Sequence, residues 1–173
     1  MKKNKFLDEI NNPSDIKKLN INELNILSEE ISTYIHDIVS DLGGHYSSPL
    51  GVVDLTLALN FVYNIPDDKI VWDVGHQTYA HKIITGRREE FKQLRQKDGI
   101  SGFLKIDESK YDIFGAGHAS TSISAALGFA HSRDKNNENN NILAIIGDGA
   151  MTGGLAYEGM NNLGYHRTQL TVV

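Results

Sequence analysis

Ile142-Leu143-Ala144-Ile145-Ile146-Gly147-Asp148-Gly149-Ala150 is the stretch of sequence that decides the fold. Its first five residues form a continuous apolar run, which is typical of a parallel strand buried on both faces. Asp148 follows this run, so its carboxylate is expected at the ligand-binding edge of the sheet, where the flanking glycines would admit a phosphate and a cation. One carboxylate suits Mg²⁺, which also takes phosphate oxygens and water. The competing interpretation is that Asp148 only caps the next helix.

Further strands and helices are predicted on both sides of this stretch. Residues 69–74 and 170–173 read as additional strands, the latter as a second buried strand, and residues 120–133 and 154–163 read as helices. Strands that alternate with helices predict an α/β fold in which a mostly parallel sheet is flanked by helices.

The N-terminal half is predicted to be helical. Apolar residues recur every three or four positions over residues 22–41, and Asn20 with Glu23 forms a plausible capping box. Residues 1–20 are polar and are expected to form an extended arm or a lead-in that contacts a partner. The other assignments are a buried helix at 52–63, helical segments at 79–85 and 89–96, a loop at 98–107 and a solvated connector at 134–141. We therefore divide the chain into the arm, 1–20, and one partial domain, 21–173.

Two further patterns could carry chemistry. The Gly-rich turn at 115–122 opens a helix, where free N–H groups and the hydroxyls of Ser120, Thr121 and Ser122 could bind an anion, although many helices begin this way for capping reasons alone. Three histidines, His45, His76 and His118, each follow a glycine in a loop. Histidine can exchange protons near neutral pH, but a lone loop histidine is more often structural.

Composition excludes several classes of protein. The chain has 173 residues, a net charge of −5 and no cysteine. An acidic chain lacks the basic surface of a nucleic-acid binder, and no run reaches the ~20 apolar residues of a membrane span. The absence of cysteine rules out disulfides and thiolate metal sites and fits a reducing compartment, so a cytoplasmic protein is expected.

Taken together, five stretches resemble 1-deoxy-D-xylulose-5-phosphate synthase, a family of transketolase-like thiamine-diphosphate enzymes. Trp-Asp-Val-Gly-His-Gln followed by Thr-Gly-Arg-Arg separates this family from ordinary transketolases. The five stretches are Ser-Asp-Leu-Gly-Gly-His (40–45), Ile-Val-Trp-Asp-Val-Gly-His-Gln (70–77), His-Lys-Ile-Ile-Thr-Gly-Arg-Arg (81–88), Gly-His-Ala-Ser-Thr-Ser-Ile-Ser (117–124) and Ile-Gly-Asp-Gly-Ala-Met-Thr (146–152).

The resemblance implies a fold, a reaction and roles for individual residues. The fold is the diphosphate-binding domain of thiamine-diphosphate enzymes. The reaction is a transfer in which pyruvate loses CO₂ and joins glyceraldehyde 3-phosphate, for isoprenoid, thiamine and pyridoxine synthesis, in a homodimer. By position, Asp148 ligates Mg²⁺, His45 shuttles protons or holds substrate, and His76 touches the cofactor's diphosphate or the reacting centre. The residues implied to line the cofactor are Gly117, His118, Ala119, Gly149 and Ala150; at Ala119 the family commonly has serine.

The resemblance also implies that parts of the site lie outside this chain. The family's second metal ligand is an asparagine 25 to 30 residues after Gly-Asp-Gly, and the glutamate that activates the cofactor belongs to another domain. Asn161 and Asn162 cannot substitute, because the helix that carries them runs ~15 Å away from the metal edge. We therefore expect the 173-residue chain to be an inactive fragment.

Three alternatives stay open from the sequence. The chain could belong to another transketolase-like enzyme or dehydrogenase subunit, or it could be a non-catalytic remnant that acts as an interaction module. A nucleotide-binding domain is the weakest alternative, because no Gly-x-Gly-x-x-Gly and no Walker-type lysine follows a strand.

Overall fold

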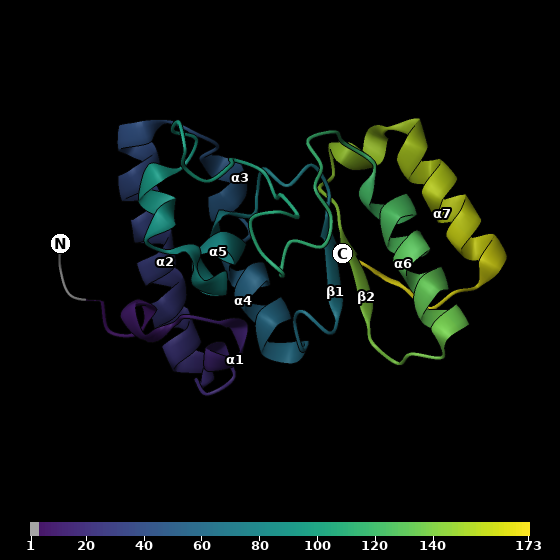
Figure 1. The fold of residues 1–173 in the computed structure, drawn as a ribbon, viewed down its shortest axis with the longest axis horizontal. Helices are drawn as coiled ribbons and strands as arrows, with labels where there is room; N and C mark the ends of the chain where they lie inside the picture. The colour runs from purple at the N-terminus through teal and green to yellow at the C-terminus, as the bar shows by residue number, and fades with distance from the viewer. Residues whose placement is uncertain (1–3) are drawn as a thin grey trace. The chain divides into compact units, whose positions relative to one another are not determined.

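The computed structural model describes residues 4–173, which form two compact units (Figure 1). The first unit contains the residues up to 64 together with 76–102, and the second contains 65–75 together with 103–173. Each is described by itself below. Within residues 4–173, no helix is long and apolar enough to cross a membrane.

The first unit is helical and is built around α2, Ile21–Leu42. The predicted capping box is confirmed: the Asn20 side chain accepts from the amide of Glu23, and the Glu23 carboxylate accepts from the amide of Asn20. The inner face of α2 packs against α4. The other elements of this unit are α1 Pro13–Ile16, α3 Ser47–Leu50, α4 Val53–Val62, α5 Tyr79–Lys82 and short turns of 3-10 or π type at Leu7–Glu9, Ile83–Arg87 and Glu90–Gln93.

The N-terminal segment differs from the extended arm that the sequence predicts; its residues 1–3 lie outside the described part. Leu7, Ile10 and Ile16 are buried in the core of the first unit. The Glu30 carboxylate of α2 accepts hydrogen bonds from the amides of Phe6 and Leu7 at 3.0 and 2.8 Å. The expectation of an extended arm was wrong, because three isolated apolar residues show no periodicity and because the Glu30 bonds to Phe6 and Leu7 come from a distant helix.

The second unit contains a parallel sheet in the order β1-β2-β3, which confirms the predicted α/β class. β1 is Lys69–Trp72, β2 is Ile142–Ile145 and β3 is Thr171–Val172. β2 is buried along its whole length, as its continuous apolar run predicts. β3 is exposed rather than buried, because it pairs only with β2 within the described chain.

Two helices complete this unit. α6, Ser122–Asn136, packs on β1 and β2, and α7, Gly154–His166, packs on α6 (Figure 1). The helices approach closely at Gly159, where an added Cβ would lie 2.9 Å from the Ser124 Oγ. α6 continues into the segment expected to be a connector and ends at Asn137, whose left-handed conformation (φ 55°) stops it.

Candidate functional site

The carboxyl ends of β1 and β2 place two acidic residues at the same edge of the sheet. Asp73 follows β1 directly and is 1% exposed. Asp148 lies three residues beyond the end of β2 and is exposed, and its Oδ1 accepts a hydrogen bond from the amide of Gly149 at 2.8 Å. Because the strands are parallel, this is the edge at which α/β proteins bind their ligands.

The Gly-rich turn at 117–122 lies beside the turn at 147–153 that carries Asp148. The Ser120 hydroxyl donates a 2.6 Å hydrogen bond to the carbonyl oxygen of Ala150. A Cβ added at Gly153 would overlap the same hydroxyl oxygen. The two turns are therefore in direct contact, as a shared ligand site at this edge requires.

The hydroxyls of residues 120–122 and the amides of Ser120 and Ser122 are hydrogen-bonded or buried in this structure, which corrects the sequence-based expectation that they bind an anion. The amides of Ser120 and Ser122 donate to the two carboxylate oxygens of Asp73, at 2.8 and 2.9 Å. The Thr121 hydroxyl donates to the carbonyl of His118, and the Ser122 hydroxyl is buried. The bonded groups hold the turn together, and the buried Ser122 hydroxyl has no hydrogen-bond partner within the described residues.

The rest of the backbone in the two turns, at residues 117–119 and 147–150, is accessible to a ligand. Within residues 4–173, the amides of residues 117–119 and of Ala150 have no hydrogen-bond partner. A Cβ added at Gly117, Gly147 or Gly149 would meet no atom within 4 Å. Packing therefore does not require these glycines, although the φ of 158° at Gly117 favours glycine there, and an anion has free space beside unpartnered N–H groups.

The residues present fit a magnesium ion that a phosphate group brings with it. No group of three or more histidine and carboxylate side chains in the described part of the chain lies close enough to hold a metal ion alone. Asp148 is exposed beside the open backbone, so it can supply one carboxylate while phosphate oxygens and water supply the other ligands.

A histidine pair lies in the first unit. The ring centroids of His45 and His76 are 5.4 Å apart with the rings at 69°. The buried Tyr79 hydroxyl accepts from the His45 amide at 3.1 Å and lies 3.3 Å from its Nδ1. The structure thus brings together two of the three predicted histidines, whereas His118 is exposed in the second unit.

The pKa of His45 is lowered, so its ring stays neutral at pH values somewhat below 6.5. Burial, followed by the charges of His76 and Arg95, lowers the pKa of His45 below 6.5. Since the unfolded chain then binds this proton more tightly, the stability that His45 contributes is complete above pH 6.5 and is lost as the pH falls from there through the folded value. We expect an NMR titration of the His45 ring to give a pKa below 6.5.

The variant His76→Gln separates the two causes. Removing the neighbouring charge should raise the pKa of His45 but leave it below 6.5, because burial is the larger cause. His36→Gln serves as the control, since His36 is not among the charges that shift His45. A His45 pKa at or above 6.5 in the unmodified chain would contradict the prediction.

Two residues that hold the candidate site residues in place, Tyr79 and Asp73, were not singled out from the sequence. Tyr79 orders His45, and a Cβ added at Gly44 would lie 3.0 Å from the Tyr79 hydroxyl oxygen. Asp73 anchors the 117–122 turn. A signal for Asp73 was present, because it directly follows a strand, as Asp148 follows the next one.

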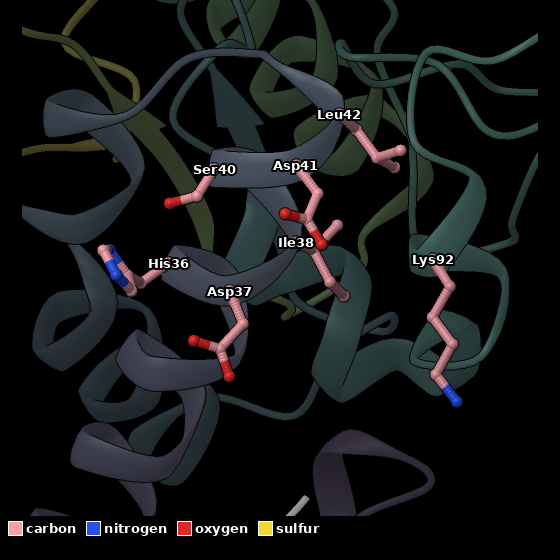
Figure 2. Close-up of a pocket in the computed structure, with 7 residues that line it drawn as sticks. All are labelled: His36, Asp37, Ile38, Ser40, Asp41, Leu42 and Lys92. Atoms are coloured by element: carbon pink, nitrogen blue, oxygen red, sulfur yellow. The ribbon is translucent and has the colours of Figure 1, made fainter.

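A cavity of about 560 Å³ lies along the last turns of α2 (Figure 2). It contains none of the predicted site residues. Asp37 and Asp41 are one helical turn apart, and the Lys92 amino group does not point toward either of them (Figure 2). We assign this cavity no role. Its lining residues are His36, Asp37, Ile38, Ser40, Asp41, Leu42 and Lys92.

The fold defines the class of protein. It is similar to transketolase from Campylobacter jejuni subsp. jejuni, with a TM-score of 0.75 and 22% identity over 86% of this chain and 27% of that one. It is also similar to transketolase from Leishmania mexicana, with a TM-score of 0.63 and 20% identity over 79% of this chain and 25% of that one. The chain therefore has a transketolase-like fold.

Sequence comparison narrows this class to one family. The pattern of the 1-deoxy-D-xylulose-5-phosphate synthase family matches residues 7–173, and the chain belongs to that family. It is 57% identical to 1-deoxy-D-xylulose-5-phosphate synthase from Caldanaerobacter subterraneus subsp. tengcongensis over 97% of this chain. It is 58% identical to 1-deoxy-D-xylulose-5-phosphate synthase 2 from Geobacter sulfurreducens over 98% of this chain. In both comparisons the chain spans 27% of the length of the relative.

Proposed function

We propose that this chain supplies the diphosphate-binding part of a 1-deoxy-D-xylulose-5-phosphate synthase, a transferase that uses thiamine diphosphate and Mg²⁺. The observation that carries the proposal is the contact between the 117–122 turn and the Gly-Asp-Gly turn, through Ser120 and Ala150. That contact puts open amides beside an exposed carboxylate at the ligand edge of a parallel sheet. When bound, the cofactor supplies the electron sink for decarboxylating pyruvate and joining the remaining two carbons to glyceraldehyde 3-phosphate.

The residues of the second unit bind and orient the diphosphate in this proposal. Asp148 would supply the carboxylate ligand of a Mg²⁺ ion that accompanies the diphosphate. The N–H groups of Ala150 and of residues 117–119, unpartnered within the described residues, donate to phosphate oxygens, and Gly149, whose N–H donates to Asp148 Oδ1, lines the same turn. Ala119 has no hydroxyl, so only its backbone can take part.

The histidine pair provides proton chemistry in this proposal. Because its pKa is lowered, His45 is neutral at pH 7, so one ring nitrogen can accept a proton or a hydrogen bond from a substrate hydroxyl. The Tyr79 hydroxyl restrains the His45 backbone and ring. His76 packs edge-on against His45 and completes the pair.

Calorimetry with Mg²⁺ and thiamine diphosphate tests the binding role. We expect the 173-residue chain to bind the cofactor when Mg²⁺ is present and to lose binding when EDTA removes the metal. Absence of binding under both conditions would favour a non-catalytic interaction module over a cofactor-binding one.

We further propose that the 173-residue chain alone is inactive, because it spans about a quarter of the length of its relatives. Incubation with cofactor, pyruvate and glyceraldehyde 3-phosphate should give no product, and product formation would refute this part. Substrate screening of a longer protein that contains the chain would separate a synthase from another transketolase-like enzyme.

From the resemblance we also propose a cytoplasmic homodimer as the working enzyme. Exposed apolar side chains on α7 support an association surface. These side chains are Leu155, Tyr157, Met160 and Tyr165. Light scattering of the purified protein would test the dimer.

A further inference from the structure

We infer that Asp73 is a positioning residue, which fixes the 117–122 turn against the Gly-Asp-Gly turn and so sets the spacing of the diphosphate-binding amides. This inference rests on the proposed function for its link to the cofactor. Its structural part stands on the hydrogen bonds of the second unit alone.

The first step is the cap that Asp73 forms on α6. The preceding residue, Thr121, makes no side-chain cap of its own. Asp73 takes that place from the end of β1: its Oδ1 accepts from the amide of Ser120 at 2.8 Å and its Oδ2 from that of Ser122 at 2.9 Å. One buried carboxylate therefore ties the start of the helix to the end of a strand 47 residues earlier in the chain.

The second step is the unusual conformation of Ser120. Its φ of 70° lies in the left-handed region, which is unfavourable for a residue other than glycine, so surrounding contacts must hold it there. Asp73 binds its amide on one side, and Ala150 accepts its hydroxyl hydrogen on the other. Ser120 therefore links Asp73 through two hydrogen bonds to the turn that contains Asp148.

The third step concerns the charge of Asp73. A buried carboxylate near a diphosphate would repel it, so a direct ligand role is unfavourable. Asp73 instead saturates the amides of Ser120 and Ser122, and the open amides of residues 117–119 remain for an anion. The negative charge of Asp73 thus stabilises the N-terminus of α6. The neutral peptide groups of residues 117–119, which precede the helix, are left for the ligand.

The experiment compares Asp73→Asn with a matched variant at the other end of the same strand. Asp68 immediately precedes β1, is also buried, and accepts hydrogen bonds from the Asn141 amide and side chain. Asp68→Asn therefore makes the same chemical change to a buried, amide-binding aspartate at the opposite edge of the sheet.

Hydrogen–deuterium exchange on the whole chain gives the first readout. We expect Asp73→Asn to speed exchange at least tenfold at Ser120 and Ser122 and detectably in the 147–153 turn, whereas Asp68→Asn leaves both turns unchanged. If Asp73→Asn does not alter exchange in either turn, or if Asp68→Asn alters them equally, the positioning role is refuted.

Affinity for Mg²⁺–thiamine diphosphate gives the second readout. Asp73→Asn should weaken binding about tenfold, Asp73→Ala should weaken it further, and Asp68→Asn should stay within twofold of the unmodified chain. Equal weakening by Asp73→Asn and Asp68→Asn would overturn the inference. If the unmodified chain binds no cofactor, the proposed function fails for this chain, and the exchange result alone still decides whether Asp73 positions the turns.

Discussion

Replacing Asp148 with asparagine is expected to lower the affinity of the chain for Mg²⁺–thiamine diphosphate by about 100-fold or more, since even residues outside a metal's direct ligand set contribute 10–100-fold. Asparagine keeps the shape of the side chain but removes the charge that attracts the cation. Calorimetry over a range of Mg²⁺ concentrations measures this. The affinity of the unmodified chain should rise with Mg²⁺, and that of Asp148→Asn should depend on it much less.

Glu158→Gln is the control for this prediction. Glu158 is exposed on α7, in the same unit, so this variant loses one negative charge without touching the Gly-Asp-Gly turn. We expect its affinity to stay within twofold of the unmodified chain. If both variants weaken binding equally, the effect is one of overall charge, and if Asp148→Asn binds normally, the carboxylate has no role in holding the metal.

The parts of the fold that depend on local sequence could be predicted. The run at 142–146 is apolar at every position, which is typical of a parallel strand buried on both faces, and β2 is that strand. Helix α2 followed from its repeat of three and four residues, and its start followed from the box formed by Asn20 and Glu23. In each case neighbouring residues carry the whole signal.

The errors arose where distant residues decide the structure. Leu7 and Ile16 join the core of the first unit, and Glu30, far along the chain, binds the backbone amides of Phe6 and Leu7. The end of α6 was placed too early because Asp134-Lys135-Asn136 is polar enough to read as a connector, whereas the helix includes these residues and is capped by Asn137 in the left-handed conformation.

The candidate site divides in the same way. The place of Asp148 at the sheet edge could be predicted because it follows a recognisable strand. The hydrogen bonds made by Ser120 and Ser122 could not be predicted. Their acceptors, Asp73 and Ala150, follow two different strands, and only the pairing of those strands brings them close to the turn. A Gly- and Ser-rich helix start therefore indicates where an anion can bind, but it does not tell which N–H groups are free to bind it.

Replacing Gly153 with alanine is expected to destabilise the chain by about 1–3 kcal/mol, the usual effect of overpacking. The backbone of Gly153 (φ −80°, ψ 141°) suits alanine, so on backbone grounds alone the change would stabilise the chain by about 0.4–1 kcal/mol. The new Cβ would overlap the Ser120 hydroxyl and lie 3.2 Å from the Ser120 Cβ. Because a hydroxyl that is already hydrogen-bonded to Ala150 cannot turn away freely, the steric effect should exceed the entropic one. Urea denaturation measures the free energy of unfolding.

A second substitution should rescue this variant. Ser120→Gly removes the two side-chain atoms of Ser120 that the alanine would crowd. Glycine at φ 70° also relieves about 1–2 kcal/mol of strain, while a hydrogen bond of about 1 kcal/mol is lost. The double variant should therefore be more stable than the sum of the single effects by about 1 kcal/mol or more, which is the size of coupling found between residues in contact. Additive effects would mean that residues 120 and 153 do not touch. The steric contact between the two turns would then be absent, and their proximity would depend on the Ser120–Ala150 hydrogen bond alone.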